Sequence, residues 1–283
     1  MAKFPIGIMA DSFRLSLRDG LKKAAELGAQ GVQIYAVAGE ISPEEMTPVH
    51  RKELLKYIKG LGIRVSALCG DMGGHAFADE ANNPWRVERS KRIMDLALDL
   101  ECNVVTTHIG VVPQDENHPR RAVMANACAE LARYADSVGA FFAVETGPEP
   151  SQRLRGFLDS LGSKGVGVNL DPANLAMVVG EDAASAVKNL APYIVHTHAK
   201  DGVMIRQTDP ERIYGFFAEG GIEDMRMEDY FKEVPLGKGD VKWPEYIAAL
   251  EAAGYKGFLT IEREVGDDPA RDIAEAVEFL KKL

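Results

Sequence analysis

Gly165-Val-Gly-Val-Asn169-Leu-Asp171 and Ile194-Val-His196-Thr-His198-Ala-Lys200-Asp201 are the two stretches that decide the fold of this chain. Each is a short, largely apolar run that ends in polar residues, which is typical of a buried strand. Residues 182–191 between them are amphipathic with a helical period. The pattern predicts a strand–helix–strand unit in which both strands run the same way.

The same unit repeats along the whole sequence. Strands are expected at Phe4–Ala10, Gly31–Ala36, Arg64–Gly70, Asn103–Gly110, Ala140–Gly147, Gly165–Asp171, Ile194–Asp201 and Gly257–Glu264. Helices are expected around 15–28, 48–61, 84–101, 120–138, 151–161, 182–191, 243–253 and 269–282. Eight such units without a linker predict one α/β domain over residues 1–283, a single (β/α)8 TIM barrel. An open doubly wound sheet is the rival, but Gly7-Ile-Met-Ala-Asp-Ser lacks the glycine-rich turn that would favour it.

One connection breaks this rhythm. Residues 202–241, after the seventh strand, are expected to form a long loop insertion with only a weak helical stretch at 210–218. Loops of this length commonly act as lids, binding walls or subunit contacts, although a family-specific decoration is the alternative.

Composition narrows the class of protein. The chain has 283 residues, 46% of them hydrophobic, and 33 basic against 43 acidic residues give a net charge of −10. Such an acidic surface argues against nucleic acid and anionic membranes as partners. Three cysteines without CxxC spacing, Cys69, Cys102 and Cys128, argue against disulfides. With no signal-length or membrane-length apolar run, a cytoplasmic location is expected.

Ionisable residues occupy the carboxyl ends of four consecutive predicted strands. They are Glu145, Asp171, His198 and Glu262. Because side chains alternate along a strand, the four side chains lie on one face, and their neighbours on the other face are mostly apolar, such as Val144. Catalytic groups of a TIM barrel lie at this end, so the four side chains are expected to converge there.

Three carboxylates and an imidazole brought together require a compensating positive charge. A divalent metal ion provides it, and a mixed oxygen and nitrogen set suits Mn²⁺, Mg²⁺, Co²⁺ or Zn²⁺. The structural alternative is that the carboxylates pair with Lys or Arg and that His198 is a core histidine.

The motifs that carry this pattern resemble the xylose isomerase-like TIM-barrel superfamily of sugar isomerases and epimerases. They are Val144-Glu145-Thr-Gly, Asn169-Leu-Asp171-Pro-Ala-Asn174-Leu, Val195-His196-Thr-His198-Ala-Lys200-Asp201, Pro235-Leu-Gly237-Lys-Gly239-Asp and Thr260-Ile-Glu262-Arg. The resemblance spans essentially the whole chain, and its motifs specify the superfamily better than the substrate.

The resemblance implies a function. It makes Glu145, Asp171, His198 and Glu262 the ligands of one divalent ion, often Mn²⁺, with Glu145 and Glu262 as the catalytic acid/base pair. The implied reaction is epimerisation or isomerisation of a ketose, keto-polyol or sugar phosphate through a metal-stabilised cis-enediolate. The resemblance also implies a homo-oligomer, a dimer or a tetramer.

Asn174 departs from the free-ketose 3-epimerases, which typically have histidine there, and looks more like the pentulose-5-phosphate 3-epimerase branch.

Three alternatives to a sugar epimerase or isomerase remain open. The same metal and base suit a dehydratase of the inosose or dehydroshikimate type; a catalytically inactive sugar-binding barrel would retain only binding. An AP endonuclease of this fold needs more histidines than the six present.

Further candidates for substrate binding are Asn174, His108, Lys200, His196, Arg206 and His75. His196 shares a face with His198 and is alternatively a buried structural histidine. Lys200 can bind a phosphate or carboxylate, or alternatively pair with Asp201 or Asp171. Arg206 is a candidate anchor for an anionic group, and His75 lies on a loop able to close over a substrate.

Overall fold

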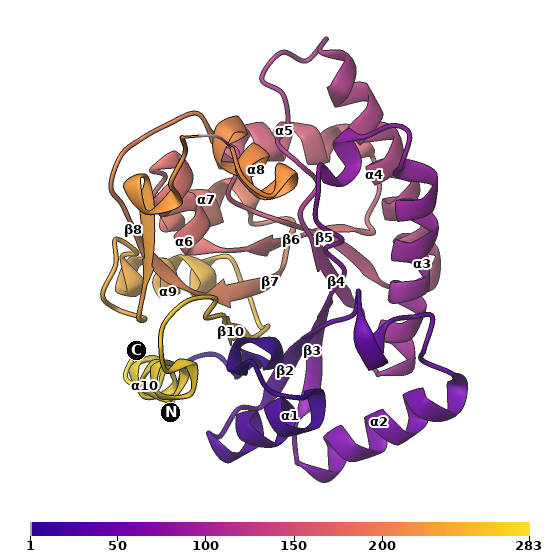
Figure 1. Cartoon of the computed structure of the whole chain (residues 1–283), viewed down its shortest axis with the longest axis vertical. Coiled ribbons are helices and arrows are strands. Elements are labelled where there is room, and N and C mark those ends of the chain that lie inside the picture. The colour runs from indigo at the N-terminus through magenta and orange to yellow at the C-terminus, as the bar shows by residue number, and fades with distance from the viewer. Residues whose placement is uncertain (1, 223) are drawn as a thin grey trace.

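Eight parallel strands close into a barrel in the computed structural model, which describes residues 2–222 and 224–283. The strand order around the barrel is β1-β10-β7-β6-β5-β4-β3-β2 (Figure 1). The strands are β1 (Ile6–Met9), β2 (Gly31–Tyr35), β3 (Arg64–Cys69), β4 (Val104–Thr107), β5 (Phe141–Glu145), β6 (Val166–Leu170), β7 (Ile194–Ala199) and β10 (Leu259–Ile261). This confirms the predicted (β/α)8 barrel.

The principal helices surround the barrel. They are α1 (Leu17–Glu26), α2 (Pro48–Gly60), α3 (Asn83–Asp99), α4 (Pro119–Val138), α5 (Ser151–Leu161), α7 (Ala183–Leu190), α9 (Trp243–Ala252) and α10 (Pro269–Leu280). Each buries one apolar stripe against the strands; on α4 it includes Met124, Leu131 and Ala135. Gly139, with φ of 75°, ends α4 in the left-handed conformation that turns the chain into β5.

The segment 202–241 differs from the expected loop. β8 (Asp201–Met204) and β9 (Phe231–Val234) pair antiparallel as a separate two-stranded sheet, and α8 (Pro210–Glu219) lies between them in sequence. The strands were missed because their partners are about 30 residues apart and β9, Phe-Lys-Glu-Val, carries two charges. Only the helical stretch at 210–218 coincides with a structural element, α8.

A second unexpected element follows β6. The short helix α6 (Pro172–Asn174) continues directly into a π-helix, Leu175–Val179, before α7 begins. The sequence pattern predicts no helix between Asp171 and residue 182.

The inside of the barrel is polar. Gln33, Thr106, Asn169, His196 and Thr260 are all buried on the inward faces of strands. Gly7 on β1 makes room for this layer, since a Cβ at that position would come within 2.6 Å of Thr260 Oγ1. The network of hydrogen bonds among these side chains forms the floor beneath the four strand-end residues.

Candidate active site

Glu145, Asp171, His198 and Glu262 meet at one point in the barrel. Each offers one ligand atom, and these four atoms all lie within 4.8 Å of one another. His198 Nδ1 is 3.4 Å from Glu145 Oε1, 3.3 Å from Asp171 Oδ2 and 3.2 Å from Glu262 Oε2. All four side chains are buried. The convergence expected from strand alternation is therefore present.

Asp171 is held by the turn that follows it. Its Oδ1 accepts hydrogen bonds from the backbone N–H groups of Ala173 (2.8 Å) and Asn174 (2.9 Å), which caps α6. Pro172 lies in the first turn of α6, a favoured position for proline. With Oδ1 occupied in this way, Oδ2 remains directed toward His198.

Amides surround Glu145. Asn169 Nδ2 donates to its Oε2 at 3.1 Å, and Asn174 Nδ2 donates to Oε1 at 3.3 Å. Both donors are neutral, so they fix the orientation of the carboxylate without cancelling its charge. Asn174 thus lies beside the cluster, with its backbone on Asp171 and its side chain on Glu145.

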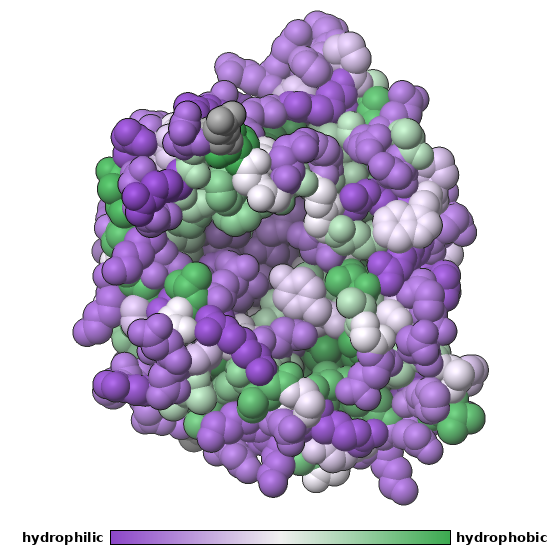
Figure 2. Space-filling view, viewed as in Figure 1, coloured by the Kyte–Doolittle hydropathy of each residue, from purple (hydrophilic) through white to green (hydrophobic). Residues whose placement is uncertain are grey.

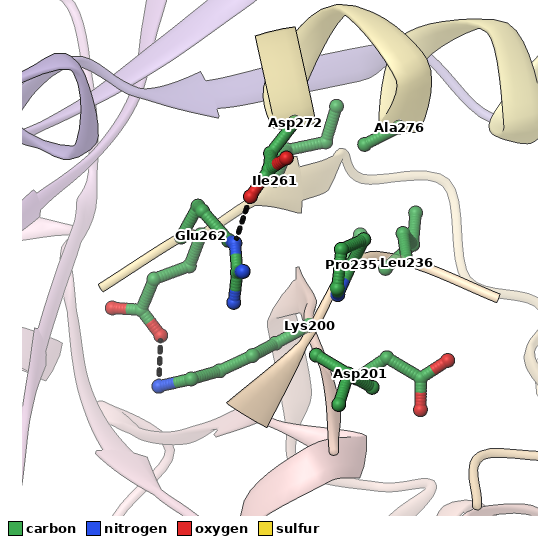
Figure 3. A pocket seen from close by; sticks show the side chains of 11 residues that line it. Lys200, Asp201, Pro235, Leu236, Ile261, Glu262, Asp272 and Ala276 are labelled. Carbon is green, nitrogen blue, oxygen red and sulfur yellow. Dashed lines mark hydrogen bonds and ion pairs between the residues drawn. The ribbon is translucent and has the colours of Figure 1, made fainter. Parts of the chain in front are cut away.

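Glu262 is held by a cation. Lys200 Nζ donates to Glu262 Oε2 at 3.0 Å and also contacts Glu264, while neighbouring Asp201 points away (Figure 3). Burial opposes the charge of Glu262, but His198 and Lys200 outweigh it and hold the pKa of Glu262 well below its usual range. The same carboxylates, Glu262 first, overcome burial and raise the pKa of Lys200. Lys200 pairs with neither Asp201 nor Asp171.

His196 lies beneath the cluster in the polar floor. Its Nδ1 is 2.9 Å from Asn169 Oδ1, and its Nε2 is 3.0 Å from Thr260 Oγ1. Burial, followed by the charge of His198, lowers the pKa of His196 well below its usual value. A neutral ring with both nitrogens hydrogen-bonded matches the structural alternative for this residue.

His108, at the end of β4, faces the cluster from the side. Its Nδ1 is 2.9 Å from Asp71 Oδ2, and its Nε2 is 3.9 Å from Glu145 Oε1. Burial opposes protonation, but Glu145 and Asp71 outweigh it and raise the pKa of His108 to about 10. A positively charged donor thus lies beside Glu145, in a position to contact a bound substrate.

Tyr214 on α8 also reaches this region, which no sequence pattern had indicated. Its ring centroid is 5.6 Å from that of His108. A Cβ at Gly147 would come within 2.7 Å of Tyr214 Oη, which explains glycine in the β5–α5 connection. The insertion therefore covers part of the barrel end. Figure 2 shows a hollow with a hydrophilic floor near the centre of this face of the molecule.

The two remaining candidates lie away from the cluster. The exposed His75 contacts Glu219 on α8, with 2.6 Å between Nε2 and Oε1. The exposed Arg206 lies over the ring of Tyr230, 4.4 Å from its centroid, within the insertion. Among the contacts of the described residues, neither joins any of the four clustered side chains.

Two further polar residues were missed. Gln33 is a polar side chain in the middle of the strand Gly31-Val-Gln33-Ile-Tyr35, between the apolar residues valine and isoleucine. That anomaly was visible in the sequence. Glu149, in the connection after β5, is buried, and burial raises its pKa to about 7. Nothing in the sequence around Glu149 distinguishes it from a surface glutamate.

The four clustered side chains are of the kind that can hold a divalent metal ion. The cluster contains three carboxylates, and the ammonium group of Lys200 pairs with just one of them, Glu262. Oxygen ligands with one imidazole suit borderline and hard divalent ions. Glu145, Asp171 and Glu262 each place one carboxylate oxygen within 3.4 Å of His198 Nδ1.

The fold and this site define a class of protein. The family model described as "Xylose isomerase-like TIM barrel" matches residues 21–283. The chain belongs to this family. An uncharacterized protein of Methanocaldococcus jannaschii is 22% identical over 209 residues, a match that covers 69% of this chain and 61% of that protein's length.

Solved structures share the whole fold. A xylose isomerase domain protein from Planctomyces limnophilus has a TM-score of 0.79 and 26% identity, covering 99% of this chain and 96% of its own. The probable 3-DHS dehydratase AsbF from Bacillus anthracis has a TM-score of 0.74 and 18% identity, covering 98% and 99%. D-Psicose 3-epimerase from Clostridium cellulolyticum H10, solved with D-tagatose, has a TM-score of 0.72 and 15% identity, covering 99% of each chain.

Two further predictions from the sequence concern the cysteines and membrane-spanning helices. Cys69, Cys102 and Cys128 are all buried and free. No helix within residues 2–222 and 224–283 combines the length and the apolar character needed to cross a membrane.

Proposed function

We propose that this chain is a divalent-metal-dependent sugar epimerase or isomerase acting on a ketose, keto-polyol or sugar phosphate. The observation that carries the proposal is the convergence of Glu145, Asp171, His198 and Glu262 within 4.8 Å. The likeness to D-psicose 3-epimerase supports the same class of substrate. We also propose Mn²⁺ as the preferred ion and a homo-oligomer, a dimer or tetramer, as the assembly.

The residues divide the chemistry between them. Asp171 and His198 would hold the ion together with the two glutamates, and the bound ion would stabilise negative charge on the substrate oxygens as a Lewis acid. One glutamate would remove the proton next to the carbonyl, giving an enediolate, and the other would return a proton to the opposite face. Glu145 ends β5 and Glu262 directly follows β10. Because β6 and β7 lie between these two strands, the two glutamates approach a bound sugar from different directions.

The surrounding side chains would position the substrate. Asn174 can hydrogen-bond a hydroxyl group, and His108 and Tyr214 provide a charged donor and an aromatic wall beside Glu145. Lys200 is held by Glu262 and Glu264, so we propose that it orients Glu262 in addition to any contact with an anionic substrate group. Arg206 and His75 stay candidates that only a movement of the insertion would bring to the substrate.

A dehydratase is the second candidate, and one observation favours it. The probable dehydratase AsbF shares the fold over 98% of this chain. The same base would then remove the proton, but the enolate would break the C–O bond of a β-hydroxyl group, which would leave as water after taking a proton from the second glutamate, instead of being reprotonated at carbon.

Hydrogen exchange in D₂O tests both candidates. The protein is incubated with Mn²⁺ and a panel of ketoses, ketose phosphates and inososes, the ion is removed, and proton NMR locates the deuterium. Deuterium next to a carbonyl supports the epimerase, whereas a new enone absorbance supports the dehydratase. Bound metal without either result for any compound contradicts enolate chemistry and supports a binding protein.

Matched variants assign the exchange to the site. Glu262→Gln is expected to slow exchange about 100- to 10,000-fold, because it removes one acid/base group. Glu264→Gln, which loses a contact with the same Lys200 but lies outside the cluster, is the control and is expected to exchange at nearly the original rate.

A further inference from the structure

Gln33 joins opposite sides of the barrel. It lies in the middle of β2, fully buried, between the apolar residues Val32 and Ile34. Its Nε2 donates to Thr106 Oγ1 on β4 at 2.9 Å, and its Oε1 is 3.0 Å from His198 Nε2 on β7. A buried amide with both ends hydrogen-bonded is a specific arrangement, since an unpaired amide there would be costly.

The two nitrogens of His198 face different surroundings. Nδ1 faces the carboxylates of Glu145, Asp171 and Glu262. A neutral imidazole carries its proton on one nitrogen and its lone pair on the other, and only the lone pair can bind a metal ion. Nδ1 can therefore act as a ligand only when the proton is on Nε2, and that N–H needs an acceptor.

Gln33 Oε1 is that acceptor. Within the part of the chain that the structure describes, the other polar atom paired with His198 Nε2 is Asn169 Nδ2, at 3.2 Å, and it is a donor. Asn169 is fixed in this orientation because its Oδ1 accepts from His196 and its Nδ2 donates to Glu145. Without Gln33, Nε2 would face a donor, which favours the tautomer with a proton on Nδ1, directed at the carboxylates.

We propose that Gln33 is a positioning residue that holds His198 in the Nε2–H tautomer and so keeps Nδ1 available to a divalent ion. The inference rests on the metal site of the proposed function but not on the reaction or the substrate. Thr106 anchors the far end of the amide, and it is expected to contribute less, since it does not touch His198.

Metal titration of four variants tests this directly. Gln33→Met removes the acceptor at similar size and is expected to weaken Co²⁺ and Mn²⁺ binding about 10- to 100-fold, as changes in the partners of metal ligands do. Gln33→Glu keeps an acceptor and is expected to bind the ions clearly more tightly than Gln33→Met does. Thr106→Val should give an intermediate loss.

Val32→Ala is the matched control, because it removes packing from the same strand without touching the network. It is expected to lower the thermal stability and leave metal affinity unchanged. If Gln33→Met binds as tightly as the original chain, or if Val32→Ala weakens binding equally, the positioning role is wrong and Gln33 only fills space.

Nitrogen-15 NMR of labelled histidine gives a readout independent of activity. In the Zn²⁺-loaded protein, His198 is expected to show a protonated Nε2 and an unprotonated Nδ1, assigned by comparison with His198→Gln. A His198 that is protonated on Nδ1 overturns the inference even if Gln33→Met fails to fold. If the original chain binds no divalent ion, the metal site itself fails; if it binds ions but Gln33 has no effect, the metal site stands and only this inference falls.

Discussion

Asp171 and Asp201 are both buried at the ends of neighbouring strands, yet the protein uses them differently. Asp201 accepts four hydrogen bonds. Its Oδ1 takes the N–H of Gly202 (3.0 Å) and of Val241 (3.3 Å), and its Oδ2 takes that of Gly237 (2.8 Å) and the indole N–H of Trp243 (2.9 Å). These donors lie at both ends of the insertion, which Asp201 therefore closes.

Asp171 satisfies one oxygen with two backbone donors and leaves the other facing His198. The comparison teaches that free acceptor capacity, more than burial, separates a carboxylate ready for a ligand from one that holds the fold together. It also explains the Gly237-Lys-Gly239 motif, because a Cβ at Gly239 would come within 2.1 Å of Asp201 Oδ1.

The largest expected effect is that of Asp171→Asn. An asparagine keeps an oxygen for the N–H groups of Ala173 and Asn174 but no longer offers a charged ligand, so metal affinity should fall more than about 100-fold. The metal-free protein should be as stable as before or more so, because repulsion among the carboxylates is reduced. Calorimetric metal titration and chemical denaturation measure both. Unchanged metal content and turnover would remove Asp171 from the site.

Asp201→Asn should have the reverse effect, a loss of stability with metal affinity retained. Its amide nitrogen would face donors at one side of the carboxylate, so we expect the free energy of unfolding to fall by about 4 kcal/mol. Folded protein should still bind divalent ions with nearly the original affinity. Denaturation in urea together with metal titration tests the pair; equal effects of the two substitutions on metal binding would erase the distinction between them.

Local pattern explains what the sequence predicted well. The alternation of strand and helix and the two-residue alternation along each strand depend on neighbours in the chain, so the barrel and the meeting of Glu145, Asp171, His198 and Glu262 followed from them. The position of each of these residues at the end of its strand can be predicted from that strand alone. The barrel then needs only to close for them to meet.

What the sequence did not reveal depends on distant partners. Asp201 and Asp171 were the expected ion-pair partners of Lys200, but it pairs with Glu262 and Glu264, which follow the last strand, β10. The β8–β9 pairing joins segments separated by all of α8. Tyr214 reaches the barrel end because the insertion folds back, which no local period encodes.

Glu149 is intermediate between the two aspartates, and it sharpens the comparison through pH. Its Oε2 accepts from the N–H of Val112 at 3.0 Å, while Oε1 has no hydrogen-bond partner within the part of the chain that the structure describes. Burial raises the pKa of Glu149 to about 7, from 4.5 for an ordinary glutamate. The folded protein thus binds the proton more tightly than the unfolded chain.

Stability should therefore fall as the pH rises from about 4.5 to about 7 and then level off. Glu149→Gln cannot ionise and should lose this pH dependence. Its stability relative to that of the original chain should therefore rise by up to about 3 kcal/mol between pH 4.5 and pH 8. Urea denaturation across this pH range measures the difference. Parallel pH profiles for the two proteins would show that Glu149 finds a compensating partner in the folded state.

The smallest effect is expected where a carboxylate is exposed. Glu219 on α8 contacts His75 at 2.6 Å, but both side chains are more than half exposed, so water competes for the pair. A double-mutant cycle with His75→Ala and Glu219→Ala should give a coupling free energy of about 0.2–1 kcal/mol, falling with added salt. A coupling above about 2 kcal/mol would instead show that this contact holds α8 over the barrel end. The insertion would then depend on two attachments, Asp201 at its base and Glu219 at its far side.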